Sequence, residues 1–303
     1  MVSAAGTQLE LTTARFSESQ FLAEEQRILD AYGNVVTQVA PTDAFDGLEV
    51  MVRPSESLTA AKATITSSMP VVFVTGRVQV PLNGRQGDTA PFYGGASTVG
   101  PGGECSSGFA VKKGTIKYMV TADHCGHTGI SFPNFHTPPG IIVGHTYYYR
   151  YSLDSQAITG TDYASTMYSG CWTCTSTKAV SGAGNPVVGT VVCASGAYSG
   201  LVCDNLVSKY PVGGIIDGHA FSGFWQIRNQ DGNGAGGFGD SGGPIYLPRS
   251  DGTAFVVGIV SSSPGESTDY GACQGLTTGR DCFQTVDIPG AGDILAWLGA
   301  TVP

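Results

Sequence analysis

A serine set between glycines and an aspartate is the most informative feature of the sequence. Residues 239–244 read GDSGGP, so Ser241 follows Asp240 and precedes Gly242. Glycines let the backbone turn tightly, so the hydroxyl can stand clear while the N–H groups of Gly239 and Ser241 converge on one point. Two converging donors would bind the oxyanion formed when a hydroxyl attacks a carbonyl. An ordinary hairpin turn is the alternative, because Gly, Asp and Ser are common in turns.

A serine hydroxyl needs a base to take its proton, and histidine is the usual base. His124 directly follows an apolar run at 118–120 and precedes Cys125, which could tie this loop to Cys105. We expect the pinned loop to hold the imidazole still, and we assign His124 as the base. The other four histidines have no comparable setting and are expected to be exposed or hydrogen-bonded in the core: His127, His136, His145 and His219.

An aspartate between base and nucleophile would orient the imidazole if the chain order is His, Asp, Ser. Five aspartates lie in that interval: Asp154, Asp162, Asp204, Asp217 and Asp231. Asp162 begins a strand-like run with small or apolar neighbours that should bury it, whereas Asp204 follows a cysteine and Asp231 lies in a Gly-rich turn. We therefore expect Asp162 to hold His124, with Asp154 as the alternative.

Three motifs in this order resemble the chymotrypsin-fold serine peptidases, and more narrowly the secreted bacterial branch of streptogrisins and α-lytic protease. They are TADHC around His124, TDYA around Asp162 and GDSGGP around Ser241, and the match covers about residues 92–303. The resemblance implies an all-β fold of two antiparallel six-stranded β-barrels, with the triad in the cleft between them. It also implies a serine endopeptidase that forms an acyl-enzyme on protein or peptide substrates, without a cofactor.

One position departs from the branch. The residue after the first cysteine of the 193–203 loop is commonly an arginine that pairs with the aspartate beside the nucleophile, and here it is Ala194. Because an unpaired buried carboxylate is costly, Asp240 should find another cation. The candidates are Arg228, Lys178 or an α-amino group made by processing.

Primary specificity follows from the resemblance alone. Ala235, six residues before Ser241, would lie at the base of the specificity pocket, which then lacks the carboxylate needed to bind Lys or Arg. Phe238, Ser262 and Ser263 would line the surroundings, and Ser261, in a strand that lines the substrate backbone, would help to hold Asp162. We expect cleavage after apolar or medium-sized side chains.

The cysteines favour disulfides in an oxidising compartment. Eight cysteines allow 105 connectivities, among which the sequence alone does not choose. Their four local groups favour the pairs Cys105–Cys125, Cys171–Cys174, Cys193–Cys203 and Cys273–Cys282. The CxxC at 171–174 could instead begin a zinc site, but no second CxxC or suitably spaced histidine completes one. We expect no metal.

Composition excludes several classes of protein. The 303 residues include 44 glycines and only 13% charged residues, which is typical of turn-rich β-proteins. A net charge of −9 provides no basic surface for nucleic acid. No apolar run approaches the roughly 18 residues of a membrane span. We expect a secreted monomer, and residues 1–6 lack the features of a signal peptide.

The first 90 residues differ in character from the rest. Ser17 and Gln20 form a capping-box pattern, Phe16 could staple onto Phe21, and an amphipathic helix should run to Gly33 with Leu22, Ile28, Leu29 and Tyr32 on its apolar face. A strand at 48–52, a helix at 54–66 and a strand at 70–80 should follow. This α+β module (residues 1–90) more weakly resembles the pro-segments of the same branch, which implies a zymogen cut within 82–93; an unrelated permanent domain is the alternative.

The remaining residues, 91–303, should form the peptidase domain. Short β-rich runs recur about every ten residues, and a closing helix is expected at 293–300. The runs lie at 107–111, 117–121, 140–151, 163–167, 187–194, 224–230, 244–247 and 255–261. Two rival functions stay open: a catalytically silent binding protein of this fold, and an esterase of another fold, whose GxSxG would require a helix after the serine.

Overall fold

The computed structural model describes residues 15–42, 44–53, 56–75, 84–126, 134–138, 140–265 and 269–303. The chain divides into two compact units, Met1–Leu82 and Asn83–Pro303. The sequence-based boundary near residue 90 is therefore several residues too late, because residues 84–90 belong to the second unit.

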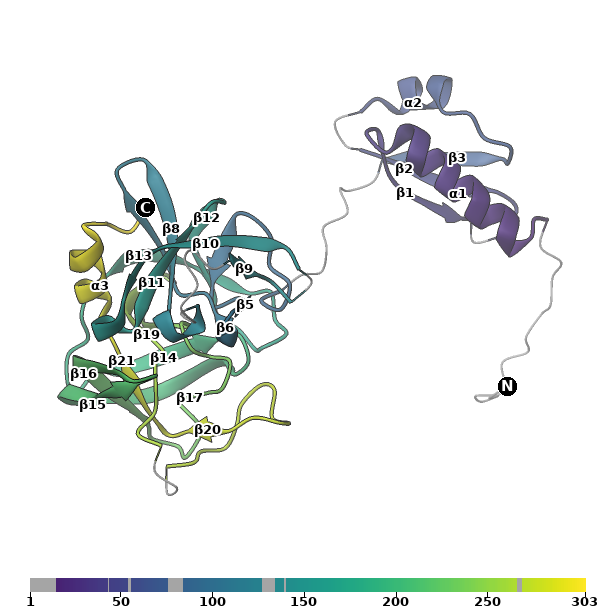
Figure 1. Ribbon diagram of the computed structural model, residues 1–303. Helices are drawn as coiled ribbons and strands as arrows, with labels where there is room; N and C mark the ends of the chain where they lie inside the picture. The colour runs from purple at the N-terminus through teal and green to yellow at the C-terminus, as the bar shows by residue number, and fades with distance from the viewer. Residues whose placement is uncertain are drawn as a thin grey trace, which may run out of the picture. The chain divides into compact units, whose positions relative to one another are not determined.

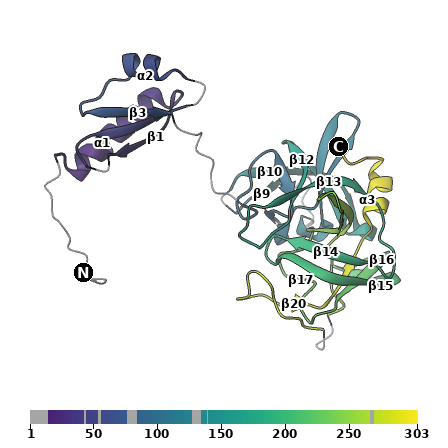
Figure 2. The ribbon, with the colours of Figure 1, turned by 180° about the vertical axis from the view of Figure 1, so that it is seen from behind.

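The first unit is a three-stranded sheet with two helices (Figure 1). Its elements are α1 (Glu18–Tyr32), β1 (Val36–Pro41), β2 (Leu48–Val52), α2 (Leu58–Thr64) and β3 (Val71–Thr75). β2 and β3 are parallel and joined through α2, while β1 pairs antiparallel with β2. Figure 1 shows α1 in front of the strands and Figure 2 shows it behind them, so α1 covers one face of the sheet.

The start of α1 confirms the sequence pattern. Ser17 and Gln20 form the capping box, and the rings of Phe16 and Phe21 lie 5.8 Å apart. Ile28 is buried, but Leu22 and Leu29, which we expected on the packed face, are exposed. Strand β1 was not predicted, and residues 76–80 of the predicted strand at 70–80 lie outside the described residues.

The second unit contains two large sheets, a two-stranded sheet and a C-terminal helix (Figures 1 and 2). Within the described residues, the first large sheet has seven strands in the order β6 (Gly103–Ser106), β5 (Ser97–Gly100), β9 (Asn134–His136), β10 (Ile142–Arg150), β11 (Ser155–Thr159), β8 (Ile116–Thr121) and β7 (Ala110–Lys113). Every neighbouring pair in it is antiparallel. Two 3₁₀ turns, η1 (Asp123–Cys125) and η2 (Tyr151–Leu153), follow β8 and β10.

The second large sheet also belongs to this unit. Its described strands run in the order β21 (Thr285–Ile288), β16 (His219–Asn229), β15 (Gly200–Ile216), β14 (Val191–Gly196), β18 (Pro244–Pro248), β19 (Ala254–Ile259), β13 (Thr177–Ala183), β12 (Tyr163–Tyr168) and β4 (Phe92–Gly94). β17 (Gly236–Gly237) pairs with β20 (Cys282–Phe283), and α3 (Ala291–Leu298) closes the chain. The two described sheets therefore have seven and nine strands rather than the expected six each, and β12 of the second sheet also contacts β7 and β8 of the first.

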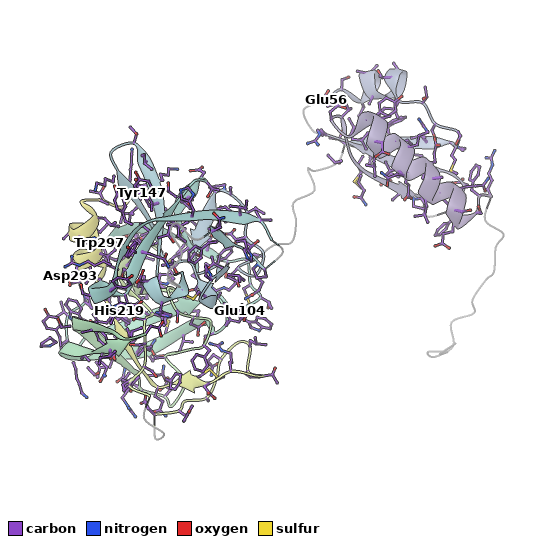
Figure 3. All side chains as sticks on the ribbon, viewed as in Figure 1. Glu56, Glu104, Tyr147, His219, Asp293 and Trp297 are labelled. Carbon is purple, nitrogen blue, oxygen red and sulfur yellow. A yellow bond between two sulfur atoms is a disulfide. The ribbon has the colours of Figure 1, made fainter. Side chains whose placement is uncertain are left out.

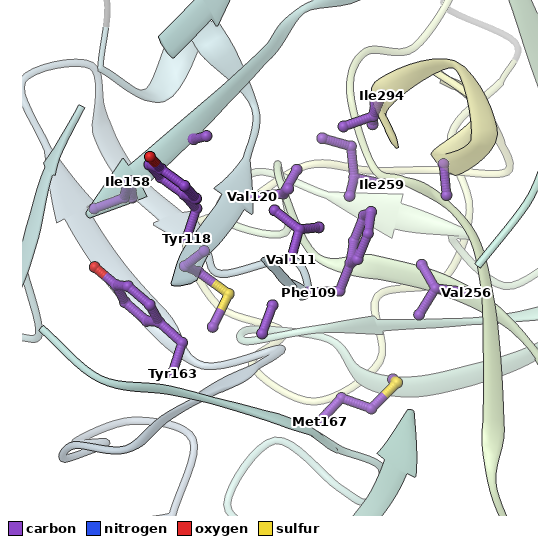
Figure 4. Close-up of a cluster of buried hydrophobic side chains, with 14 of the residues drawn as sticks. Phe109, Val111, Tyr118, Val120, Ile158, Tyr163, Met167, Val256, Ile259 and Ile294 are labelled. Atoms are coloured by element: carbon purple, nitrogen blue, oxygen red, sulfur yellow. The ribbon is translucent and has the colours of Figure 1, made fainter. Parts of the chain in front are cut away.

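A hydrophobic core crosses from one half to the other. Phe109, Val111 and Ile158 from the first sheet lie in the same buried cluster as Val256 and Ile259 from β19, and Ile294 of α3 covers it (Figure 4). Each of the eight predicted strand runs overlaps an observed strand. Helix α3 begins and ends two residues earlier than the predicted closing helix at 293–300.

All four predicted disulfides are present, Cys105–Cys125, Cys171–Cys174, Cys193–Cys203 and Cys273–Cys282. The cysteines of the CxxC therefore bind each other, which rules out the alternative of a zinc site begun by them. Among the described residues, none of the helices has the length and apolar character needed to cross a bilayer.

Candidate active site

His124 is fixed by its position on the 3₁₀ turn η1 and by a buried aspartate. The turn follows β8 and is tied back to β6 by the Cys105–Cys125 disulfide. The Nδ1 atom of His124 lies 2.8 Å from Oδ2 of Asp154, and the backbone N–H of His124 donates to Oδ1 at 3.0 Å. The hydroxyl of Ser261 donates to Oδ2 of Asp154 at 2.5 Å. These contacts hold the imidazole in one orientation.

Asp162 does not take the place we predicted for it. Its side chain is 61% exposed and pairs with Lys117 at 2.8 Å, whereas the side chain of Asp154 is only 3% exposed. Asp154 adopts a left-handed φ of +39° between η2 and β11, a conformation that aspartate tolerates better than most residues. Both aspartates precede strands, so the local sequence did not discriminate between them. Ser261 likewise holds Asp154 rather than Asp162.

Carboxylates surround the imidazole. Burial by itself lowers the pKa of His124, but the charge of Asp154 and its hydrogen bond outweigh burial, and the net pKa is raised above the ordinary value for histidine. Asp123 is buried beside it with no hydrogen-bond partner on Oδ1, and burial together with the charge of Asp154 raises the pKa of Asp123 to about 7. Asp217, at the tip of the β15–β16 hairpin, adds to the raised pKa of His124.

Ser241 shares a cavity of about 450 Å³ with His124 and Gly239. The backbone takes left-handed φ values of +91° at Gly239 and +87° at Gly242, and a Cβ on Gly239 would lie 2.5 Å from the ring of Tyr198. Among the described residues, the N–H groups of Gly239 and Ser241 make no hydrogen bond, so both can serve a substrate oxygen. No hydrogen bond joins the Ser241 hydroxyl to His124 in this part of the chain; such bonds often tighten only when substrate binds.

Comparison with solved structures identifies the fold. A glutamic acid-specific serine protease that uses a histidine triad in substrate binding is 25% identical, with a TM-score of 0.54 over 70% of this chain and 100% of its own. A Nocardiopsis protease is 20% identical, with a TM-score of 0.50 over 69% of this chain and 96% of its own. The chain has the chymotrypsin-like fold of bacterial serine proteases. The two large sheets are the β-barrel halves of this fold. The chain is a serine-type endopeptidase, and its substrates are proteins or peptides. A scan of family models found no match.

The partner of Asp240 in this protease is Arg280. Its guanidinium lies 2.6 Å from Oδ2 of Asp240, and the two side chains are only 4% and 1% exposed. Asp240 also accepts hydrogen bonds from the N–H groups of Tyr198, Ser199 and Gly237. Two of the expected partners are therefore wrong, because Arg228 pairs with Asp269 and Lys178 donates to the carbonyl of Gly252. Arg280 holds the place for which an α-amino group made by processing was the third candidate. Arg280 was missed because it lies C-terminal to the nucleophile, between Cys273 and Cys282.

The substrate pocket of the protease differs in one predicted residue. Phe238, Ser261, Ser262 and Ser263 line the cavity as expected. Ala235 is fully buried among the apolar side chains of the second sheet and is not among the residues that line the cavity. The sequence reading missed three apolar residues that line the cavity, Ile216, Phe283 and Val286. Phe283 and Val286 lie more than forty residues after Ser241, where no local motif marks them.

None of the other described histidines lines the cavity that contains Ser241. His136 contacts the carbonyl of Thr137, His145 is half-buried on β10, and His127 lies outside the described residues. His219, labelled in Figure 3, stacks on Tyr151 with ring centroids 3.9 Å apart. One described group of side chains, Cys105, His124 and Cys125, has the proximity of metal ligands, but its two cysteines form a disulfide and are not free to bind a metal.

Proposed function

We propose that Ser241, His124 and Asp154 are the catalytic triad of this protease. The observation that carries the proposal is the 2.8 Å contact between Nδ1 of His124 and the buried Asp154, because His124 also lines the cavity that contains Ser241. A carboxylate on Nδ1 keeps the proton on that nitrogen and leaves Nε2 free to accept the proton of the serine. The buried carboxylate also stabilises the imidazolium as it forms.

The reaction then follows from these groups. The Oγ atom of Ser241 bonds to the scissile carbonyl carbon as its proton passes to Nε2 of His124, and the carbonyl oxygen becomes an oxyanion held by the N–H groups of Gly239 and Ser241. When the C–N bond breaks, His124 gives this proton to the departing amine. Water then attacks the acyl-enzyme with His124 as base, and the carboxylic acid leaves with Ser241 restored.

The pocket supports cleavage after apolar side chains. Val260, Phe283 and Val286 form apolar walls, Gly236 and Gly237 add backbone, and Ser262 and Ser263 add hydroxyls. An uncompensated lysine or arginine would lose its hydration against these walls. The charged lining residues, Glu104 and Asp217, are both exposed to solvent, where a carboxylate binds a cation only weakly.

Glutamate specificity is not carried over from the related protease. That enzyme uses a histidine triad in substrate binding. The described residues that line this cavity include a single histidine, His124, which the proposed triad already uses. A peptide library should therefore be cut after Phe, Leu or Met, and preferred cleavage after Glu, Lys or Arg would contradict the assignment of the pocket.

We also propose a secreted proenzyme that is a monomer when active. Four disulfides are typical of an oxidising compartment, and the first unit has its own core around Phe21, Ile28 and Val50, as a separately folding pro-segment would. Active material whose chain still began at residue 1 would contradict removal of this unit.

Labelling with a fluorescent phosphonate tests the triad directly, because only an activated serine attacks the phosphorus. The wild-type chain should be labelled with one probe per molecule, and Ser241→Ala should not. Ser165→Ala is the matched control, since the Ser165 hydroxyl binds the carbonyl of Pro303 away from the cavity. A folded wild-type chain that still resists the probe after its first unit has been removed would favour the catalytically silent binding protein.

A further inference from the structure

Arg85 is a completely buried arginine in a segment whose sequence, LNGRQGDT, reads as a flexible connector. Its guanidinium donates to the carbonyl oxygen of Gly196, to the carbonyl of Gly170 at 3.1 Å and to the hydroxyl of Ser195 at 3.2 Å. Its own carbonyl accepts the N–H of Ser97 at 2.6 Å. These bonds connect the segment to the end of β14 and to two other parts of the second unit.

The residues after Arg85 are equally well anchored. The amide of Gln86 donates to the carbonyl of Ala197 at 2.5 Å and to that of Trp172 at 3.2 Å. Asp88 is buried and accepts the hydroxyl of Tyr168 at 2.9 Å and the N–H of Tyr93 at 2.8 Å. The segment is therefore part of the packed protease unit rather than a linker.

A short chain of contacts leads from this segment to the nucleophile. Arg85 and Gln86 hold the carbonyls of Gly196 and Ala197, and the next two N–H groups, of Tyr198 and Ser199, bind the carboxylate of Asp240. Gly196 also packs directly on Asp240, since a Cβ built on it would lie 2.2 Å from Oδ1. Asp240 in turn precedes Ser241 and accepts the N–H of Gly237 at 3.0 Å.

We propose that Arg85 is a positioning residue for the loop that carries the Gly239 and Ser241 donors, and that residues 85–88 remain part of the active protease. The inference rests on the proposed function of Ser241. Arginine suits the position because its planar fork can bind three oxygens at once, which the ammonium of lysine does not match. It also places a second positive charge in the surroundings of Asp240, beside that of Arg280, and this charge attracts the Asp240 carboxylate.

Kinetics of the protease matured from full chains that carry Arg85→Lys or Arg85→Met test this role. Active sites are first counted with the phosphonate probe, so that misfolded protein does not enter the rate. We expect kcat per active site to fall about tenfold in Arg85→Lys and about a hundredfold in Arg85→Met, with KM changed less than about twofold, because misplaced donors affect the transition state. Arg228→Met, which removes an ion pair with Asp269 instead, should keep the wild-type kcat.

Two kinetic results would overturn the inference. Wild-type kcat per counted site in both Arg85 variants would mean that the arginine only stabilises the fold. A raised KM with unchanged kcat would mean that it acts on the substrate pocket instead. If the protease matured from the wild-type chain neither reacts with the probe nor cuts peptides, the proposed function fails rather than this inference.

The N-terminus of wild-type active material gives a second test that requires no variant. Probe-labelled protein is isolated after maturation and its intact mass and first residues are determined. We expect every labelled chain to retain Arg85. Labelled, active material beginning after residue 85, for example at Phe92, would overturn the inference even if neither arginine variant folds.

Discussion

Replacing Asp154 by asparagine should nearly abolish peptide hydrolysis, whereas the same change at Asp162 should not. Asp154 accepts three hydrogen bonds, from the backbone N–H of His124, from its Nδ1–H and from the hydroxyl of Ser261. An asparagine has one acceptor oxygen, so its NH₂ group must face one of these donors. If that group faces Nδ1, the imidazole proton moves to Nε2, which can then no longer accept the proton of Ser241.

The expected loss in kcat is about 10⁴-fold, equivalent to about 5 kcal/mol of transition-state stabilisation. The pH profile should change as well. Asp154 raises the pKa of His124 against the opposing effect of burial, so the activity of the wild-type protease should rise with pH through a value above about 6.5. Without that carboxylate the largest contribution opposing burial is lost, so the pKa of His124 should fall and the residual activity of Asp154→Asn should begin at lower pH.

The protonation of His124 affects stability and activity in opposite directions as pH rises. Because the pKa of His124 is higher in the fold than in the unfolded chain, its protonated form stabilises the fold below about pH 6.5. This contribution is lost as pH rises through the folded-state value, while the neutral base needed for catalysis appears.

The assay is kcat/KM from pH 4 to 9 on active-site-counted enzyme, with Asp162→Asn as matched control. Asp162 is exposed and its ion pair with Lys117 contributes little, so this variant should keep wild-type rates. A large loss in Asp162→Asn together with near-normal rates in Asp154→Asn would refute the assignment of the triad.

Three further changes have predictable results. In the wild type, burial raises the pKa of Asp123 to about 7 from an ordinary 3.8, so the fold loses stability as pH rises between those two values. Asp123→Asn should therefore raise Tm at pH 8 and leave Tm unchanged at pH 4. Equal shifts in Tm at both pH values would contradict this. Arg280→Met leaves the buried carboxylate of Asp240 without its cation and should lower the urea-unfolding free energy by about 3–5 kcal/mol, so a loss below about 1 kcal/mol would mean that the pair is weak. Replacing both Cys105 and Cys125 by serine opens a link across 20 residues and should cost about 3 kcal/mol in the same assay; an unchanged midpoint would show that the turn is held by other contacts.

Local signals carried most of the sequence-based prediction. The capping box of α1, the alternating strands and the Gly-rich turn around Ser241 each depend on residues within a few positions of one another, and each was found where expected. Disulfide pairing was also predictable, because the four pairs are separated by only 3 to 20 residues. β15 was missed because Asp204, Pro211 and two adjacent glycines read as turn signals, although the strand is held by long pairing with β16.

The sequence by itself predicted a serine nucleophile and a histidine base and determined an all-β framework, because those features reside in short motifs and in the spacing of the strands. The tertiary structure alone decided which carboxylate contacts His124, which arginine pairs with Asp240, which side chains line the cavity beside Ser241 and where the second unit begins. The bonds that decide these points span 30 residues for His124 to Asp154, 40 for Arg280 to Asp240 and 111 for Arg85 to Gly196. Over such separations the path of the packed backbone decides which side chains meet. Asp154 and Asp162 have similar sequence neighbours, yet the folded backbone buries the first and leaves the second in solvent.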